Sequence, residues 1–323
     1  MSMMRNAKVV VAGAAGLTGM HFIDALLPLD ARIRAVIHKK PLPKYGQSVE
    51  ETVRADLLDS ESCRAAFKGA DVAILSAAFV VGSKVAVENP IAIVNENLFL
   101  GARMLEACVL EGVKRVLLIG SSTTYPPYTY PVQEHEWNDP PAPVYQGIGN
   151  VKRFQEVLAK FYYDRYGLEV AIVRPTAIYG EYDHFDGEAR HVIPALIMRA
   201  LSGENPFEIW GTGDEIRDFV HAADVARAGI LALEQHAVCD PLNVGGGQPA
   251  TIGEVGRLVL DICGKRDIPI TFDPSKPTTI PVRMVDISKI KRVLGFEPRI
   301  SLHEGLSRTI NWYLNEFQKA ERS

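Results

Sequence analysis

Three glycines spaced three residues apart are the first feature of this sequence that could do chemistry. Gly13, Gly16 and Gly19 follow the apolar run Lys8 to Ala12, which is typical of a strand buried on both faces of a parallel sheet. Such glycines let the chain turn tightly and approach a pyrophosphate, and a helix from about Leu17 to Leu27 would aim its free amides at that phosphate. Glycine clusters also form plain turns, and the spacing here differs from the commoner Gly-x-Gly-x-x-Gly pattern of dinucleotide sites. The strand and helix patterns on either side favour a dinucleotide-phosphate site.

Basic residues follow the next predicted strand. The run Arg32 to Ile37 has the pattern of that strand, and His38, Lys39 and Lys40 stand where an NAD site would place an acidic residue for the ribose hydroxyls. The alternative is that these are solvated charges at the end of a strand. Because no carboxylate competes nearby, the sequence predicts NADP in preference to NAD, with NAD still possible.

Hydroxyl side chains gather after a later buried strand. Val113 to Ile119 predicts that strand, and Ser121, Ser122 and Thr123 follow it within the run Gly120 to Pro126. In open parallel sheets, ligands bind outside the carboxyl ends of the strands, so this cluster is well placed for chemistry. Serine and threonine runs also form turns, and this alternative stays open from the pattern alone.

Strand and helix patterns alternate along the chain and would position these groups. An apolar stripe at steps of three and four residues predicts a helix from Pro90 to Glu111, and the Pro- and Tyr-rich stretch from Pro126 to Gly147 predicts a surface loop or lid. The helix after this loop ends at Tyr166 and Gly167, and its predicted apolar face consists of Val151, Phe154, Leu158 and Phe161. Further helices are predicted at Ser60–Phe67, Val192–Ala200, Ala222–Leu233 and Leu302–Phe317, and further strands at Asp71–Leu75, Leu168–Val173 and Arg217–His221.

The order of these patterns predicts an α/β fold, a Rossmann-type doubly wound parallel sheet with a smaller mixed α/β lobe. We expect residues 1–174 and about 217–244 to form the dinucleotide-binding domain. Residues of about 175–216 and 245–323 would form the C-terminal substrate lobe, so the two parts interleave in sequence. A cleft between such lobes is the usual place for a ligand.

The composition excludes several classes of protein. The 323 residues are 47% hydrophobic, which is enough to fill a large α/β core, and the formal net charge of −4 gives no reason to expect nucleic acid or a membrane surface as a partner. The four cysteines lack metal-type spacing, so we predict no metal site and free thiols in a reducing compartment. Neither an apolar signal core nor a run of about 20 apolar residues is present, so we expect a cytoplasmic location.

Taken in order, the motifs resemble those of the extended short-chain dehydrogenases/reductases, a family of nucleotide-sugar epimerases, dehydratases and reductases. The resemblance covers essentially the whole chain and is nearest to the epimerase-reductases of 4-keto-6-deoxy sugars. The glycine spacing is that family's version of the phosphate loop, and Gly120 to Pro126 resembles its catalytic-serine segment. Later blocks match in order and spacing: Arg174 to Gly180, His191 to Leu196, Trp210 to Gly213, Asp218 to His221, Asn243 to Gly245 and Ser275 to Pro277.

This resemblance implies roles for particular residues. Ser121 takes the catalytic-serine position, Lys152 that of a lysine that holds the nicotinamide ribose, and His191 that of an acid or base. The implied NADP or NAD site consists of Gly13, Gly16, Leu17, Gly19, His38, Lys39, Asp56, Leu57, Ala77, Ala78, Lys152 and Pro175. The implied nucleotide-sugar site consists of Ser122, Thr176, His191, Trp210, Arg217 and Arg283, with the two arginines at the nucleotide phosphates.

One position departs from the family pattern. The family carries a tyrosine four residues before its lysine, but Ile148 stands there in front of Lys152. That tyrosine exchanges a proton with the sugar oxygen as hydride moves, which isoleucine cannot do. Three groups could supply the proton instead: Tyr145 in the preceding loop, Thr123 at the strand end, or a water held by Ser121.

Epimerisation is the second reaction affected by departures from the family. The related epimerase-reductases use a cysteine two residues after the catalytic serine together with a histidine, and here those positions hold Thr123 and His191. A neutral histidine can abstract a proton next to a ketone near pH 7, whereas a threonine hydroxyl is a very poor base, so a single-base epimerase is possible. Ser122 and Thr123 also stand in place of the acidic pair of the family's dehydratases, which disfavours dehydration.

Two functions follow from these residues. The first is an NAD(P)-dependent epimerase or epimerase-reductase that acts on a 4-keto hexose or deoxyhexose nucleotide. The alternative is a non-redox protein that binds the dinucleotide and a nucleotide sugar but has lost hydride transfer with the tyrosine. We also expect a homodimer, because the helices near Pro90 and Ile148 carry more apolar surface than one sheet face needs, and related enzymes pair these helices as a four-helix bundle.

Overall fold

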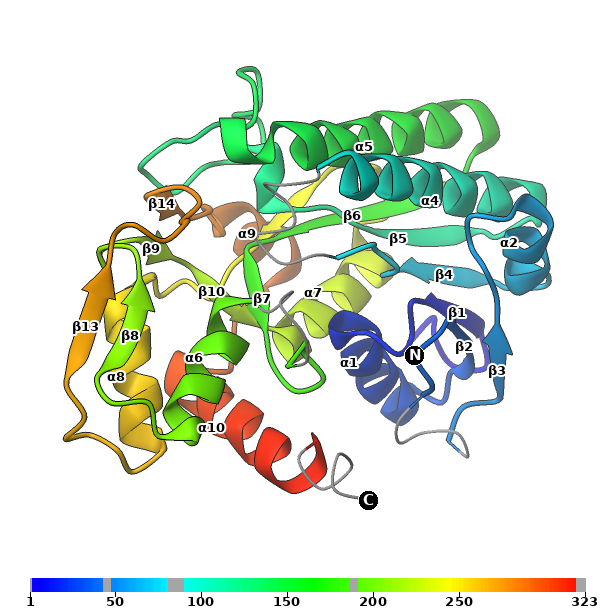
Figure 1. The fold of residues 1–323 in the computed structure, drawn as a ribbon. Coiled ribbons are helices and arrows are strands. Elements are labelled where there is room, and N and C mark those ends of the chain that lie inside the picture. Colours follow the sequence, from blue (N-terminus) through cyan, green and yellow to red (C-terminus); the bar gives the residue numbers. More distant parts are fainter. Residues whose placement is uncertain (1, 43–47, 81–89, 186–190, 318–323) are drawn as a thin grey trace.

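A seven-stranded parallel sheet forms the centre of the molecule (Figure 1). The structure is a computed structural model that describes residues 2–42, 48–80, 90–185 and 191–317. The strand order is β11-β6-β5-β4-β1-β2-β3, so the chain winds outward from β1 in both directions, as the sequence predicts. The strands are β1 (Lys8–Ala12), β2 (Arg32–Ile37), β3 (Glu51–Arg54), β4 (Val72–Leu75), β5 (Arg115–Ile119), β6 (Glu169–Pro175) and β11 (Leu242–Val244).

Strand β1 shows how both faces of the sheet are buried. Val9 and Val11 pack into the core on one face, and Val10 and Ala12 pack into the core on the other. An unbroken apolar run is therefore required, since successive side chains point to opposite faces. Helices α1 (Leu17–Leu26) and α7 (Ala222–Gln235) cover the first face, and α2 (Ser60–Phe67), α4 (Pro90–Leu110) and α5 (Gln146–Tyr166) cover the second (Figure 1).

A smaller lobe lies beside the large sheet (Figure 1). Its core joins helices α6 (Val192–Ser202), α8 (Ile252–Ile262) and α10 (Leu302–Trp312) to strand β8 (Phe207–Trp210). Short strands pair around this core as β10 with β7, β13 with β8, and β12-β9-β14. Their bounds are β7 Ala177–Tyr179, β9 Ile216–Arg217, β10 Phe219–His221, β12 Ala250–Thr251, β13 Ile270–Asp273 and β14 Val282–Arg283.

One late helix returns to the large sheet. Helix α9 (Ser288–Leu294) buries Ile290 and Leu294 in the same core as Val9 and Val11, although it lies within the sequence range predicted for the substrate lobe. The remaining short turns are η1 (Leu27–Leu29), η2 (Ser122–Thr124), η3 (Pro143–Tyr145) and η4 (Tyr313–Phe317). In the part of the chain that the structure describes, no helix combines the length and the apolar character needed to cross a membrane.

Strand β3 and the end of the last helix are among the elements that differ from the sequence prediction. Strand β3 is absent from that prediction because it lies at the sheet edge, alternates between half-buried and exposed residues, and carries charges at both ends. The final helix, predicted to reach Phe317, ends at Trp312, and a π-helical turn follows where Tyr313 stacks on Phe185 with ring centroids 4.6 Å apart. Residues 318–323 of the predicted lobe lie outside the described residues.

Half of the apolar face predicted for α5 points outward. Val151 is buried and Leu158 packs against the core, but Phe154 and Phe161 are 46% and 51% exposed. The inward face also carries polar side chains, because Gln155 donates to the carbonyl of Asn97 on α4 at 2.8 Å and Glu156 binds a buried arginine. An apolar surface is therefore left uncovered on the outside of the helix.

Candidate active site

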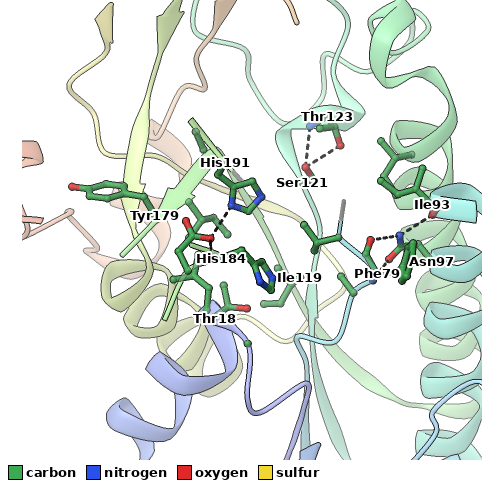
Figure 2. Close-up of a pocket in the computed structure, with 18 of the residues that line it drawn as sticks. Thr18, Phe79, Ile93, Asn97, Ile119, Ser121, Thr123, Tyr179, His184 and His191 are labelled. Atoms are coloured by element: carbon green, nitrogen blue, oxygen red, sulfur yellow. Dashed lines mark hydrogen bonds and ion pairs between the residues drawn. The ribbon is translucent and has the colours of Figure 1, made fainter. Parts of the chain in front are cut away.

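A large cavity lies between the sheet and the smaller lobe (Figure 2). Its volume is about 1480 Å³, and its walls come from the phosphate loop, the ends of the sheet strands, β8, β9 and the loop at 277–279. Figure 2 shows His184 and His191 on one wall and Ser121 with Thr123 on the other. A pocket for one small ligand occupies roughly 300–1,000 Å³, so this cavity has room for a cofactor and a second ligand.

The phosphate loop is too tightly packed to accept side chains. Gly13 has a φ of +78°, and a Cβ there would lie 2.6 Å from the Cα of Ala77. A Cβ on Gly19 would lie 2.2 Å from the carbonyl oxygen of Gly13. Helix α1 begins after Gly16, which has no side chain to cap it, so the first amides of the helix are available to an anion. This cradle fits the pyrophosphate of a dinucleotide.

The predicted adenosine end of the cavity is basic. His38 and Lys39 line it together with Asp56 and Leu57. Arg54, at the end of β3, donates to the main-chain carbonyls of His38 and Lys39, so its guanidinium charge lies beside that of Lys39. Sequence reasoning missed Arg54 because it missed β3, which pairs with β2 directly before His38.

Ser121 and Thr123 form a hydrogen-bonded pair after β5. The Ser121 Oγ accepts from the Thr123 N–H at 3.1 Å and from the Thr123 Oγ1 at 2.9 Å. Both bonds use Ser121 Oγ as the acceptor, so its own proton is free for a ligand in the cavity. The arrangement arises because Ser121 caps the short turn η2. Ser122 is buried and does not line the cavity.

Lys152 is fixed to the end of the neighbouring strand. Its Nζ donates to the carbonyl oxygen of Ile119 at 2.9 Å. Burial lowers the pKa of Lys152 to about 8, and the charge of Glu156 opposes this shift. Ile148 lies one turn earlier on α5 and lines the same cavity. The lysine thus reaches the predicted ribose region, while an aliphatic side chain stands at the family's tyrosine position.

Tyr145 lies in a cluster with two arginines on the cavity wall. The Cζ of Arg283 stands 4.1 Å from the centroid of the Tyr145 ring, and Arg217 donates to the hydroxyl of Thr279 at 2.9 Å. Burial and the neighbouring Arg283 lower the pKa of Arg217 to about 10. Within the described residues, the buried Nε and Nη2 of Arg283 have no hydrogen-bond partner. Two adjacent guanidinium groups, one of them with unpartnered donors, suit a diphosphate.

His191 lines the cavity at the start of α6. Its Nδ1 lies 2.9 Å from Oδ1 of Asp183, a carboxylate that is only 1% exposed. Burial opposes a charge on the imidazole, but the hydrogen bond and negative charge of Asp183 outweigh it, so the pKa of His191 is raised. Sequence reasoning missed Asp183, because its spacing from the histidine matches no motif and only the fold brings the two together.

The other predicted residues divide into two groups. Cavity-lining residues include Gly13, Gly16, Leu17, Ala77, Ala78, Thr176 and Trp210. Gly19 and Pro175 do not line the cavity. Gly19 packs against the phosphate loop and Pro175 ends β6, so both act from behind the cavity wall.

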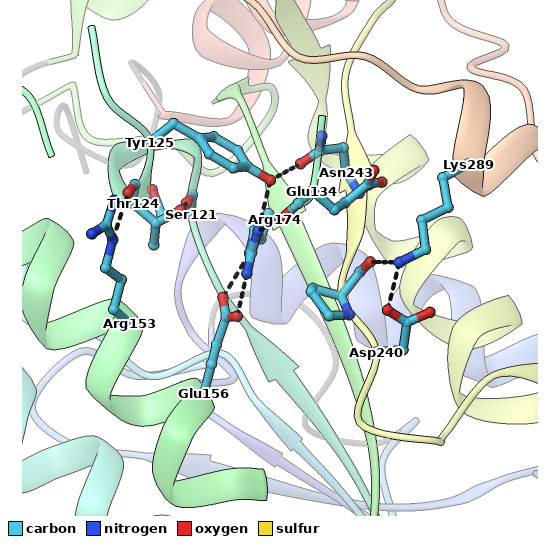
Figure 3. Close-up of polar contacts among 11 residues, drawn as sticks. Ser121, Thr124, Tyr125, Glu134, Arg153, Glu156, Arg174, Asp240, Asn243 and Lys289 are labelled. Carbon is cyan, nitrogen blue, oxygen red and sulfur yellow. Dashed lines mark hydrogen bonds and ion pairs between the residues drawn. The ribbon is translucent and has the colours of Figure 1, made fainter. Parts of the chain in front are cut away.

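A buried polar network supports the wall from behind (Figure 3). The guanidinium of Arg174 donates to both carboxylate oxygens of Glu156, at 2.9 and 2.6 Å. It also donates to the Tyr125 hydroxyl and the Glu134 carbonyl, each at 2.8 Å, and Tyr125 donates to Asn243 Oδ1 at 2.6 Å. The network ties α5 and β6 to η2 and β11, which fixes the segments that carry the hydroxyl pair and the lysine.

Comparison with known proteins identifies the family behind this geometry. The chain matches the NAD dependent epimerase/dehydratase family over residues 9–245, which include the phosphate loop and the catalytic-serine segment. The chain belongs to this family. The relationship to extended short-chain dehydrogenases/reductases that the motifs predict is therefore confirmed.

Curated relatives match almost the whole of this chain. It is 31% identical over 317 residues to a dTDP-4-dehydro-6-deoxy-D-allose reductase of Streptomyces sp, with 94% of this chain and 95% of the reductase covered. It is 30% identical over 318 residues to GDP-L-fucose synthase 1 of Arabidopsis thaliana, with 96% and 94% covered. Both names fall in the class of nucleotide-sugar enzymes that the sequence analysis expects.

The fold of this chain is shared with solved structures. A UDP-glucose 4-epimerase of Thermotoga maritima, determined with UDP-glucose, has a TM-score of 0.84 and 26% identity. The match covers 97% of this chain and 99% of that epimerase, so it includes both the large sheet and the smaller lobe. The predicted Rossmann-type architecture is therefore confirmed.

Proposed function

We propose that this protein is an NADP-dependent epimerase-reductase of a 4-keto hexose or deoxyhexose linked to a nucleoside diphosphate. The observation that carries the proposal is a cavity that joins three features: a glycine cradle, a centre formed by Ser121, Lys152 and His191, and a pair of arginines of which Arg283 has unpartnered donors. The relatives named as a 4-keto sugar reductase and a GDP-L-fucose synthase support the substrate class.

Reduction requires a held ketone and a proton donor. The nicotinamide group, when bound, supplies the hydride to the carbonyl carbon. Lys152 binds the ribose hydroxyls from its anchor on Ile119, and Ser121 donates its free proton in a hydrogen bond to the ketone oxygen. Tyr145 is the proposed donor of the proton that this oxygen finally takes up, because it lines the cavity three residues before Ile148.

Epimerisation uses the same ketone, which acidifies the C–H bonds beside it. We assign proton removal to His191, with the electron pair moving to the ketone oxygen as an enolate that Ser121 hydrogen-bonds. Return of a proton to the opposite face of that carbon completes the inversion. A water held by the Thr123 hydroxyl is the proposed donor on that face, because Thr123 stands on the opposite cavity wall from His191 (Figure 2).

The arginine pair is assigned to the nucleotide. Arg217 and Arg283 line the cavity together with Trp210 and the loop at 277–279, so a diphosphate on the guanidinium groups leaves the base within reach of an aromatic ring. The basic end at His38 and Lys39 is assigned to the additional phosphate of NADP.

A non-redox binding protein is the second candidate, and Ile148 favours it because the family's phenol is missing. This candidate keeps the cradle for the dinucleotide and the arginines for the nucleotide sugar. It differs from the enzyme in one measurable respect, which is turnover.

Incubation with a dTDP- or GDP-linked 4-keto-6-deoxyhexose and NADPH in deuterated water tests the proposal. We expect oxidation of NADPH and deuterium on the carbon next to the carbonyl. His191→Asn should stop the deuterium exchange while NADPH still binds. Tyr145→Phe should slow NADPH oxidation by about 10²–10⁴-fold without changing cofactor affinity, because a positioned acid or base contributes that much.

Tyr166→Phe is the matched control, because Tyr166 ends α5, the helix that begins after Tyr145, and is 58% exposed. Its rates should equal those of the wild type. If calorimetry shows that the wild type binds both ligands but neither NADPH oxidation nor exchange occurs, the binding role replaces the enzymatic one.

The proposal extends to the organisation of the molecule. Residues 1–174 with about 217–244 would bind the dinucleotide, and about 175–216 with 245–323 would bind the nucleotide sugar. We also propose a homodimer, supported by the exposed Phe99 on α4 and the exposed Phe154, Val157 and Phe161 on α5. Cytoplasmic location stays a prediction from the sequence.

A further inference from the structure

We infer that Asp183 is a positioning residue that fixes the proton-transferring atom of His191 as Nε2. The inference rests on the proposed function in one respect, the assignment of His191 to proton removal beside the ketone. It adds a residue that no motif marks and predicts which form of the imidazole is present before any substrate binds.

The carboxylate is held in one orientation. Asp183 is only 1% exposed, and its Oδ1 accepts from the main-chain N–H of His184 at 2.8 Å and lies 2.9 Å from Nδ1 of His191. Figure 2 shows the imidazole with this bond, on the wall that faces Ser121 and Thr123. The backbone of the loop thus orients the acceptor, and the acceptor orients the ring.

The hydrogen bond selects one tautomer. An ionised carboxylate accepts but does not donate, so the proton of the neutral imidazole lies on Nδ1, between His191 and Asp183. The lone pair is then on Nε2, which is the only ring nitrogen left for a ligand in the cavity. Without the carboxylate, the ring could turn or exchange tautomers, and the base would be present only part of the time.

The charge of Asp183 also offsets the positive end of the dipole of helix α6. His191 is the N-cap of α6, and the positive end of a helix dipole disfavours an imidazolium ion there. Within the described residues, the titratable groups that contact the ring are Asp183 and His184, whose ring centroid lies 6.4 Å away. The carboxylate balances the imidazolium that forms when Nε2 takes a proton.

Proton transfer starts at the carbon beside the ketone. Its C–H bond breaks, the proton moves to Nε2, and the electron pair becomes the enolate at the ketone oxygen. The imidazolium then carries protons on both nitrogens, with the Nδ1 proton still directed at Asp183. The enolate takes a proton from the water on the opposite face, and the hydroxide left behind removes the Nε2 proton through the solvent, which returns the neutral ring. In deuterated water the carbon therefore gains a deuteron.

Nitrogen NMR of ¹⁵N-histidine-labelled protein without substrate tests the inference directly, with His191→Asn used to assign the signal. We expect the neutral wild-type ring to carry its proton on Nδ1. In Asp183→Asn the tautomer preference should be lost or reversed, because an amide can donate to Nδ1, and the pKa of His191 should fall by about one unit. Asp214→Asn, an exposed aspartate of the same lobe, should leave both unchanged.

Deuterium exchange into the 4-keto sugar nucleotide provides the second readout. Asp183→Asn should lower the rate at least about tenfold, by analogy with other acid-to-amide changes behind a histidine, and move its pH profile to lower pH. A wild-type ring protonated on Nε2, or equal titration of His191 in Asp183→Asn and the wild type, overturns the inference. Absence of exchange in the wild type, with the Nδ1 tautomer present, overturns the proposed reaction and leaves the positioning role standing.

Discussion

At the scale of single residues, cofactor choice depends on cations beside the adenosine end of the cavity. Lys39→Ala and Arg54→Ala should each weaken NADP binding about tenfold and leave NAD binding nearly unchanged, because only NADP has the extra phosphate and one charge-assisted contact contributes about 1.5–3 kcal/mol. Fluorescence titration with both cofactors measures this difference.

The control for the cofactor prediction is Lys68→Ala, which removes an exposed cation at the end of α2. It should change neither affinity. A clear preference of the wild type for NAD, unaffected when Lys39 and Lys40 are both replaced by alanine, would remove the basis for assigning NADP.

Site residues that belong to short sequence motifs can be predicted from the sequence. The glycine loop, the hydroxyls after β5 and the Arg174 to Gly180 block are short motifs, and residues of all three line the same cavity. Asp183 and Arg54 are different, since each acts through a contact that depends on how separate segments pack. Ser122 shows the opposite error of sequence reasoning. It belongs to the motif after β5, but its side chain is buried and does not line the cavity.

At the scale of elements, the Arg174–Glu156 pair joins helix α5 to strand β6 through a buried bidentate contact (Figure 3). Glu156→Gln should lower the free energy of unfolding by about 3–5 kcal/mol, because it leaves the guanidinium charge buried without its carboxylate. The double variant Glu156→Leu with Arg174→Met should lose less free energy of unfolding than the sum of the losses of Glu156→Leu and Arg174→Met alone, since no unpaired charge remains. Denaturant unfolding of the wild type, the two single variants and the double variant measures this coupling.

The exposed pair Lys160 and Asp164 on the same helix provides the control for the buried pair. Asp164→Asn should cost less than about 1 kcal/mol, because surface ion pairs contribute little. An equal cost for Glu156→Gln and Asp164→Asn would contradict a structural role for the buried network.

Elements with a long, regular pattern of apolar residues can be predicted from the sequence, and elements that depend on tertiary contacts cannot. Helix α4 and strand β1 bury apolar faces, so their patterns reveal them. Strand β3 is four residues at a sheet edge, where half of the side chains face solvent and leave a weak pattern. The sequence places helix α5 correctly, but it does not show which side of the helix faces inward, because the partners of Gln155 and Glu156 cannot be read from spacing.

At the scale of the whole molecule, the proposed dimer depends on the outward face of α5 beside α4. Phe154, Val157 and Phe161 are 46%, 58% and 51% exposed, and Phe99 on α4 is 58% exposed. The two helices lie side by side on one face of the sheet (Figure 1), so these side chains belong to one layer of the molecule. Burial against the same face of a second copy would form a four-helix bundle.

Phe154→Glu combined with Phe161→Glu should therefore convert a dimer into a monomer at micromolar concentration, because each change places a charge in the centre of an apolar interface. Sedimentation equilibrium and light scattering measure the mass. Phe272→Glu is the matched control, since Phe272 is 46% exposed but lies on the smaller lobe, and its variant should stay dimeric. The dimer proposal fails if the wild type is monomeric, or if the doubly substituted protein keeps the wild-type mass.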